Sequence, residues 1–354
     1  MDREIDEFLL ELLRSRSPTG SEREAADVVE KYVGAASVGG VRRDVLGNRY
    51  AVYGSGEKTL MLAGHMGEIG FIVSYIDDDG FLFFEQLGGH DNVMLPGRRV
   101  AVITKNGYVY GVTGKRAVHL MDAKERKEVP ETHQVWIDVG AQSRADAEKL
   151  VRIGDPVVYD TAVRRLSPTR YAARAFDDRA GCYCVFEALR RLSRDSAKTD
   201  YRVVSVATTQ EEIGTRGALT AAYGIDPQVG LAVDVDHATD FPTCDRRRFG
   251  HIRLGKGPVI SRGPNINPKV FERLAECAER EGIPYQIGAE SRPTGTDARV
   301  IQMTRGGVAT GLLGIPLRYM HTPSEVADLD DIEGCVRLIA AFAKSLKNSD
   351  DFSF

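Results

Sequence analysis

Several features that mark other protein classes are scarce in this 354-residue sequence. It has five cysteines and no C-x-x-C pair, which argues against a disulfide scaffold and a zinc ribbon. No apolar run approaches the roughly 20 residues of a membrane-spanning helix, and the start, Met1-Asp2-Arg3-Glu4, lacks the apolar core of a signal peptide. The 47 basic and 51 acidic residues nearly balance, which gives no electrostatic case for nucleic acid or an anionic membrane. We therefore expect a cytoplasmic protein without a nucleic-acid or membrane partner.

The remaining composition is that of an ordinary globular protein. Hydrophobic residues make up 42% of the chain and charged residues 28%. At about 150 residues per domain, the length predicts two domains, or one domain with a large insertion.

Both ends of the chain alternate between helical and strand-like patterns. Apolar residues at helical spacing from Ile5 to Leu13 predict a first helix, and Ser21 with Glu24 predicts a capping box that starts a second. Short apolar runs, typical of buried strands, lie at 59–63, 203–207 and 231–235. Helical spacing recurs at 178–192, 270–280 and 332–346. This alternation predicts an α/β fold with a mostly parallel sheet flanked by helices.

The pattern changes between residues 70 and 165, where strand-like runs dominate. Hairpins are expected at 71–84 and 100–112, the second with the strong turn signal Asn106-Gly107. We expect a small, partly open β-barrel inserted into the α/β domain. The predicted domains are therefore 1–69 with 166–354, and 70–165.

Side chains that can bind metal follow the predicted strands, which is where sites form in open α/β sheets. They are His65, Asp177, Asp178, Glu211, Glu212, Asp234 and His321. Histidines with carboxylates suit borderline divalent cations such as Zn²⁺ or Co²⁺, and five ligands can hold two cations if one carboxylate bridges them. Two cations can polarise a carbonyl and position a hydroxide, and a further carboxylate can move the proton.

Taken singly, these residues also fit structural roles. A lone histidine after a strand is more often a hydrogen-bonded residue than a ligand. Asp177 and Asp178 fit a turn with a helix N-cap, and Glu211 and Glu212 fit the start of a helix. Asp234 is harder to explain in this way, because a carboxylate inside an apolar strand is costly to bury unpaired. The set as a whole favours a metal site.

Six motifs in a fixed order connect these residues to a known family. They are His65-x-Gly67-Glu68-Ile69-Gly70-Phe71, Ala175-Phe176-Asp177-Asp178-Arg179, Gln210-Glu211-Glu212-Ile213-Gly214, Val233-Asp234-Val235, Gly295-Thr296-Asp297-Ala298 and Arg318-Tyr319-x-His321-Thr322-Pro323. Together they resemble the TET-type aminopeptidases, which are dinuclear metallopeptidases also known as deblocking or glutamyl aminopeptidases. The resemblance runs over nearly the whole chain. It implies a zinc-peptidase-like catalytic domain with an inserted PDZ-like β-barrel for dimerisation, and dimers that often form a hollow tetrahedral dodecamer admitting only peptides.

The resemblance also implies two divalent cations per subunit, Zn²⁺ or Co²⁺, and a ligand set for them. Asp177 would bridge the two cations, and His65 and Asp234 would complete the protein ligands of one. Glu212 and His321 would complete those of the other.

Three further residues receive roles from the resemblance. Glu211 would be the general base and acid, which takes a proton from the metal-bound water and passes it to the leaving amine. The family often has a cis peptide bond after the bridging aspartate, here before Asp178. Asp297 and Asp178 are candidates for binding the substrate or supporting the metal site, and Asp297 also fits a plain turn residue.

One position departs from the family pattern. The family has His-x-Asp, in which the aspartate accepts a hydrogen bond from the far nitrogen of the ligand histidine, and Gly67 stands at that position here. Loss of such a carboxylate typically costs ~10–100-fold in metal affinity or activity. Glu68 would point the other way in an extended segment. Another carboxylate or a carbonyl serves His65, or the site is weakened, or the chemistry differs, and the sequence leaves these three open.

We therefore expect a metal-dependent aminopeptidase that removes N-terminal residues from short peptides, using a metal-bridging water activated by Glu211. Two other functions stay open. One is a deacylase or amidohydrolase on the same dinuclear site, which would not depend on a free α-amine. The other is a peptide-binding scaffold weakened at Gly67. Retention of Glu211 with all five ligands argues against the scaffold, because an idle site has no physical reason to keep six costly polar groups.

Overall fold

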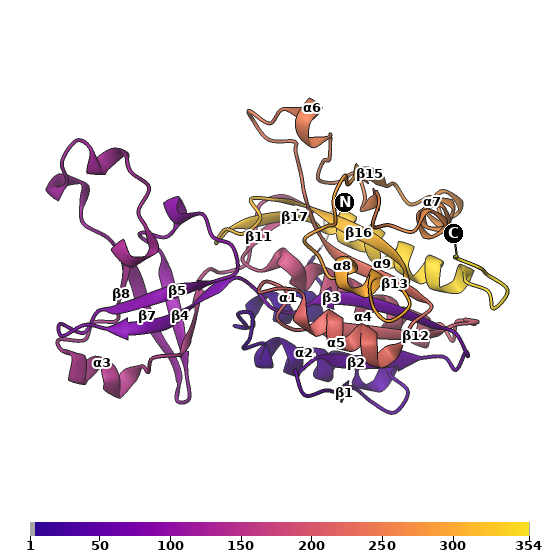
Figure 1. Cartoon of the computed structure of the whole chain (residues 1–354), viewed down its shortest axis with the longest axis horizontal. Helices are drawn as coiled ribbons and strands as arrows, with labels where there is room; N and C mark the ends of the chain where they lie inside the picture. The colour runs from indigo at the N-terminus through magenta and orange to yellow at the C-terminus, as the bar shows by residue number, and fades with distance from the viewer. Residues whose placement is uncertain (1–3, 354) are drawn as a thin grey trace.

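Helices and strands alternate along residues 4–353, the part of the chain that the computed structural model describes (Figure 1). The α-helices are α1 (Glu7–Arg14), α2 (Arg23–Val33), α3 (Arg144–Leu150), α4 (Phe176–Arg194), α5 (Arg216–Ile225), α6 (Arg246–Phe249), α7 (Pro268–Arg280), α8 (Ala298–Gln302) and α9 (Leu329–Ser345). Short 3₁₀ helices lie at Gly34–Ala36, Asn92–Met94, Val118–Leu120, Glu125–Lys127 and Thr132–Gln134. None of the described helices has the length and apolarity that a membrane crossing requires.

The strands form one large sheet and one barrel. The large sheet contains β1 (Arg42–Arg43), β2 (Arg49–Tyr53), β3 (Thr59–His65), β10 (Arg164–Arg165), β11 (Arg170–Ala173), β12 (Arg202–Thr208), β13 (Val229–His237), β14 (Val259–Arg262), β15 (Gln286–Ala289), β16 (Ala309–Arg318) and β17 (Glu325–Asp328). The barrel contains β4 (Gly70–Ile76), β5 (Leu82–Leu87), β6 (Arg99–Thr104), β7 (Gly107–Gly114), β8 (Trp136–Asp138) and β9 (Pro156–Tyr159).

The large sheet is mixed, with parallel strands at its centre and antiparallel strands at its flanks, so the prediction of a mostly parallel sheet is not confirmed. Its strand order is β1-β2-β12-β3-β13-β16-β17-β11-β10, and the central run β12-β3-β13-β16 is parallel throughout. Off this path β14 pairs parallel with β15 and antiparallel with β16. The flanking strands pair antiparallel. Short connections cause part of this, because the few residues between β1 and β2, or between β16 and β17, can join only antiparallel neighbours.

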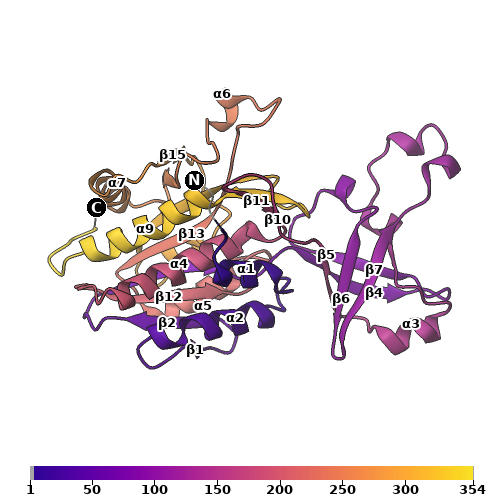
Figure 2. The same cartoon turned by 180° about the vertical axis from the view of Figure 1, so that it is seen from behind.

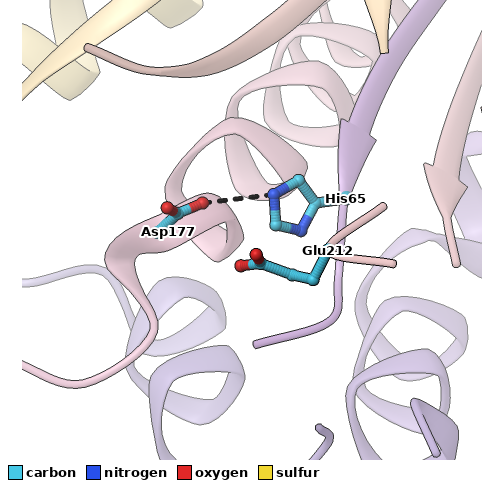
Figure 3. Close-up of side chains that lie close together, drawn as sticks. All are labelled: His65, Asp177 and Glu212. Atoms are coloured by element: carbon cyan, nitrogen blue, oxygen red, sulfur yellow. Dashed lines mark ion pairs between the residues drawn. The ribbon is translucent and has the colours of Figure 1, made fainter. Parts of the chain in front are cut away.

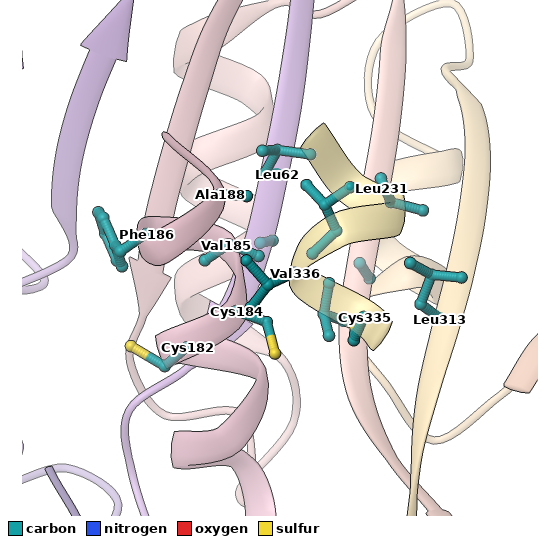
Figure 4. Packing of buried hydrophobic residues seen from close by; sticks show 14 of the residues in the cluster. Leu62, Cys182, Cys184, Val185, Phe186, Ala188, Leu231, Leu313, Cys335 and Val336 are labelled. Carbon is teal, nitrogen blue, oxygen red and sulfur yellow. The ribbon is translucent and has the colours of Figure 1, made fainter. Parts of the chain in front are cut away.

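Helices cover both faces of the central strands. On one face α4 and α9 pack together, and Val185 and Val336 meet Leu62, Leu231 and Leu313 of the strands (Figure 4). On the other face α5 and α8 contact each other and the same strands. The two faces alternate along β13, where Gly230 leaves room for α8: a Cβ there would lie 2.5 Å from Ile301 Cγ2. The five cysteines are all unpaired.

The six-stranded barrel is closed, whereas a partly open one was expected. Its strand order is β4-β5-β8-β7-β6-β9, and it lies to one side of the large sheet in both views (Figures 1 and 2). It has its own apolar core, in which the ring of Phe71 lies 4.7 Å from that of Phe84 and 5.3 Å from that of Tyr159, centroid to centroid. Strand β10, at the end of the 70–165 range, pairs with β11 in the large sheet.

The start of α2 differs from the capping box expected at Ser21 and Glu24. The N-cap is Glu22, and its side chain makes no cap hydrogen bond. The Glu22 carboxylate instead accepts the backbone N–H of Gln210, 188 positions later in the chain. Glu24 accepts the backbone N–H of Arg16. The carboxylate of Glu24, which the capping box assigned to the helix start, and that of the actual N-cap residue Glu22 therefore both bind backbone groups outside the helix.

Candidate metal centre

The parallel strands bring the predicted site residues to one edge of the large sheet. His65 ends β3, Asp234 lies in the second half of β13, and Glu211 and Glu212 follow the end of β12. His321 follows β16. Parallel neighbours end at the same edge, so residues far apart in sequence meet there.

Asp177 lies between the two histidines. One carboxylate oxygen, Oδ1, is 3.1 Å from His65 Nε2 (Figure 3), and the other, Oδ2, is 3.2 Å from His321 Nε2. Asp177 is only 6% exposed, and its peptide bond to Asp178 is cis, as the resemblance implied. A carboxylate that turns one oxygen toward each histidine has the geometry of a bridging ligand.

The remaining carboxylates surround the same two imidazole rings. His65 Nε2 lies 3.8 Å from Glu211 Oε2 and 4.0 Å from Asp234 Oδ1. His321 Nε2 lies 3.5 Å from Glu212 Oε2. The structure therefore brings together all five predicted ligands and Glu211.

Two sharp turns carry parts of this cluster. Gln210 has φ 56° and His321 has φ 61°, in the left-handed region that non-glycine residues seldom adopt. Such conformations persist only where the surroundings hold them, and they concentrate at functional sites.

Burial and crowding shift the protonation of the carboxylates. Burial raises the pKa of Glu211 to about 8, with further increases from the charges of Asp297 and Glu212 against the opposing charge of His65. Burial and the charge of Asp177 raise the pKa of Glu212 to about 7. Burial also raises the pKa of Asp234 well above its usual value.

The pKa values of both histidines are raised, which favours their protonated forms. Burial opposes a charged ring, but the hydrogen bond to Asp177 and the charges of Glu211 and Asp234 raise the pKa of His65 well above its usual value. The same balance raises the pKa of His321 to about 10, with Asp177 again the main favourable partner.

This donor set fits divalent cations. Ligand atoms of His65, Asp177 and Glu212 lie within 4.8 Å of one another, and so do those of His65, Asp178 and Asp234. Glu212 Oε1 is buried and has no hydrogen-bond partner in the described part of the chain. Two histidines cannot neutralise four clustered carboxylates, so cations would supply the missing positive charge.

Asp178 and Asp297 lie behind the side chains of the cluster that face the cavity. The two oxygens of Asp178 accept the backbone N–H groups of His65 (3.1 Å) and Gly181 (3.0 Å), so this side chain holds the backbone of β3 against α4. Asp297 is 3% exposed, accepts the Thr208 hydroxyl at 2.5 Å, and its charge contributes to the raised pKa of Glu211. Neither residue lines the cavity over the site.

A cavity of about 460 Å³ opens over the cluster. The site residues His65, Asp177, Glu211, Glu212, Asp234 and His321 line it, together with Asp236, His237, Glu290, Thr294, Thr296, Arg299 and others. The reacting groups therefore face a space large enough for part of a peptide.

Two buried carboxylates near the site, Glu325 and Glu22, were not predicted from the sequence. Glu325 accepts the backbone N–H groups of Asp177 and His321, and Glu22 accepts that of Gln210. A third buried carboxylate, that of Glu68, considered above as a partner of His65, forms ion pairs with Arg174 and Arg179. Glu325 could have been found from the sequence, because it precedes the apolar pair Val-Ala in a buried strand, where an acid is unusual.

The comparisons with known sequences and structures agree on one family. The model of the M42 glutamyl aminopeptidases matches residues 47–338. The lysyl aminopeptidase of Pyrococcus furiosus is 40% identical over 312 residues, which is 88% of each chain. Among solved structures, a TET aminopeptidase from a marine-sediment thaumarchaeon has a TM-score of 0.93 at 33% identity, covering 97% of this chain and 96% of the other. The TET1 peptidase of Pyrococcus horikoshii, which can assemble into a tetrahedron or a large octahedral shell, has a TM-score of 0.86 at 30% identity, covering 96% and 99%.

These matches confirm the TET-type resemblance, and with it a hydrolase that acts on peptide bonds. The chain belongs to the M42 glutamyl aminopeptidase family, whose members are metal-dependent aminopeptidases.

Proposed function

We propose that this chain removes N-terminal residues from short peptides at a dinuclear metal centre built on Asp177. The observation that carries the proposal is the position of Asp177, with one oxygen 3.1 Å from His65 and the other 3.2 Å from His321. His65, Asp177 and Asp234 would hold one cation. Asp177, Glu212 and His321 would hold the other.

Within this proposal, bound Zn²⁺ or Co²⁺ would supply a Lewis acid for the scissile carbonyl and would lower the pKa of water. Glu211 accepts a proton from the attacking water at its carboxylate and delivers it to the departing amine nitrogen. Its side chain is 8% exposed and lines the cavity, so it can reach substrate while bulk water is largely excluded. Asp178 and Asp297 position His65 and Glu211 and do not touch the peptide.

We also propose that the cavity favours peptides whose first side chain is cationic. Asp236, at the end of β13, and Glu290, after β15, line the cavity, and neither has an ion-pair partner among residues 4–353. Gly288 and Gly314 leave room for the Asp236 carboxylate, since a Cβ at either position would lie 3.4 Å from its Oδ2. The name of the Pyrococcus furiosus relative, a lysyl aminopeptidase, agrees with this preference.

The barrel, residues 70–165, is proposed as the dimerisation domain of the chain, and the remaining residues as the catalytic domain. Apolar side chains stay exposed on the barrel and its long loop, as expected of an interaction surface. They include Tyr110, Val112, Val118, Leu120 and Val129. The assemblies of the TET1 relative support self-association, with a dimer or a tetrahedral dodecamer as the expected product. Whether the barrel is PDZ-like stays a prediction.

The test is hydrolysis of aminoacyl p-nitroanilides with a free α-amine, on metal-stripped protein reloaded with Zn²⁺, Co²⁺ or Mn²⁺. Release that needs metal and a free amine supports the aminopeptidase. Equal or faster release from N-acetylated substrates would support the deacylase instead. Inactivity of fully loaded protein on the whole panel would contradict the proposal and favour a weakened site.

The same panel tests the side-chain preference. Lysyl and arginyl substrates should exceed leucyl and glutamyl ones in kcat/KM. Glu290→Gln should lower the lysyl-to-leucyl ratio by about tenfold, the equivalent of one charge-assisted hydrogen bond. Because Arg299 also lines the cavity, a glutamyl preference is the outcome that would overturn this part.

A further inference from the structure

One nitrogen of the ligand His65 has no partner. Nε2 faces Asp177, whereas Nδ1 is buried and makes no hydrogen bond with any residue from 4 to 353. An imidazole that binds a metal is normally oriented by a polar group at its other nitrogen, which also raises its basicity as a ligand. Glu68 does not serve this purpose, because its carboxylate is taken by Arg174 and Arg179.

Gly67, two residues after His65, has no side chain, and the N-terminal segment that contains Thr19 and Glu22 packs against it. The backbones of Thr19 and Glu68 are hydrogen-bonded at 2.9 Å, which fixes the turn along this segment. A Cβ at Gly67 would lie 3.3 Å from Thr19 Cα and 3.4 Å from Glu22 Oε1. The Glu22 carboxylate therefore occupies the place toward which a side chain at position 67 would extend.

Glu22 is a buried acid without a basic partner. It is 6% exposed and forms no ion pair with a lysine or arginine of the described chain. Its Oε1 accepts the backbone N–H groups of Gly20 and Gln210, both at 2.7 Å. Burial raises its pKa, and the charge of His65 is among the influences that lower it, without a direct hydrogen bond between the two side chains. Burying a carboxylate without a partner charge is costly, and its two backbone hydrogen bonds offset part of that cost.

We propose that Glu22 is the positioning carboxylate of His65 in this chain, acting across the space that Gly67 leaves open. The inference rests on the metal-dependent function proposed above. The same side chain holds the N–H of Gln210, so it also fixes the turn that carries Glu211 and Glu212. A second carboxylate at position 67 would lie close to that of Glu22, and the two negative charges would repel each other. Glycine at position 67 and Glu22 are therefore complementary.

Glu22→Gln separates charge from structure. The amide oxygen can still accept both backbone N–H groups, so the turn is retained while the negative charge is lost. We expect Zn²⁺ and Co²⁺ to bind the metal-stripped variant ~10–100-fold more weakly, measured by titration calorimetry with a competing chelator and without substrate. The unfolding midpoint of the metal-stripped variant should stay near that of the parent.

Position 67 supplies the rescue and its matched control. In the Glu22→Gln background, Gly67→Asp should restore most of the metal affinity, because it provides a new carboxylate. Gly67→Ala places the same Cβ against Thr19 without a charge and should restore none. With Glu22 intact, Gly67→Asp should not tighten binding.

Three results would overturn the inference. They are unchanged metal affinity in Glu22→Gln, equal rescue by Gly67→Ala and Gly67→Asp, and at least tenfold tighter binding in Gly67→Asp alone. Failure of the parent chain to bind any divalent cation would overturn the proposed function as well. Equal cation affinity in the parent and in Glu22→Gln would overturn this inference only.

Discussion

The backbone N–H of Asp177 donates a 3.1 Å hydrogen bond to Oε2 of Glu325. The other oxygen of that carboxylate accepts the backbone N–H of His321 at 3.0 Å. Glu325 is 2% exposed in β17, the strand between those that lead to the two residues. One buried carboxylate therefore sets the distance between the proposed bridging aspartate and the histidine of the second cation.

Removal of Glu325 is expected to loosen this half of the centre. Glu325→Ala leaves two buried N–H groups without acceptors, so we expect divalent cations to bind ~10–100-fold more weakly. Glu325→Gln keeps one acceptor oxygen, so its cation affinity should lie between those of the parent and of Glu325→Ala. Calorimetric titration of metal-stripped protein gives both values, with the exposed Glu276→Ala of α7 as the control. Affinity equal to the parent in Glu325→Ala would show that the other contacts suffice.

The sequence was informative where chemistry and local pattern coincide. A histidine or acid at the end of an apolar run identifies a strand and its functional end together, as at His65 and Asp234. Glu325 and Glu22 act through backbone groups 148 and 188 positions away, and no local pattern encodes such contacts. The mixed sheet was not predicted for a related reason: an apolar run indicates a buried strand but not whether the neighbouring strand is parallel or antiparallel to it.

Glu211→Gln tests the proposed proton transfer. The substitution preserves shape but removes the basic oxygen, so kcat should fall ~10²–10⁴-fold. Metal content, measured by elemental analysis, should stay at the level of the parent because Glu211 is not among the proposed ligands. Full activity with full metal content would assign the proton transfer to another group. Low metal content would instead make Glu211 a ligand.

Self-association is expected to depend on the exposed apolar residues of the barrel loop. Val118 is 52% exposed and Leu120 is 74% exposed. Replacing both by aspartate would bury charge in an interface, so the dissociation constant between subunits should rise at least tenfold, or about 1.4 kcal/mol. Analytical ultracentrifugation over a concentration series measures this. Val45→Asp, at a fully exposed position of the other domain, is the control. An unchanged mass distribution would place the interface elsewhere.

Metal binding should release protons near neutral pH. Without metal, Glu212 and Glu211 have pKa values raised to about 7 and about 8, and that of His321 is raised to about 10, so these groups hold protons at about pH 7. Ligands must lose their protons to bind a cation, so apparent affinity should rise from about pH 6 to about pH 8. Calorimetry in two buffers of different ionisation enthalpy counts the protons released.

The stability of the metal-stripped protein should show the opposite slope. The folded chain binds protons at Glu211 and Glu212 that the unfolded chain, with glutamate pKa values near ~4.3, has already lost. Stability contributed by these two groups is therefore fully present below about pH 4 and declines as pH rises toward about pH 8. The unfolding midpoint without metal should fall over that interval, and saturating Zn²⁺ should reverse the trend, because a bound cation favours the ionised carboxylates. Parallel curves with and without metal would mean that cation binding does not favour the ionised form of these two residues, and would contradict Glu212 as a ligand.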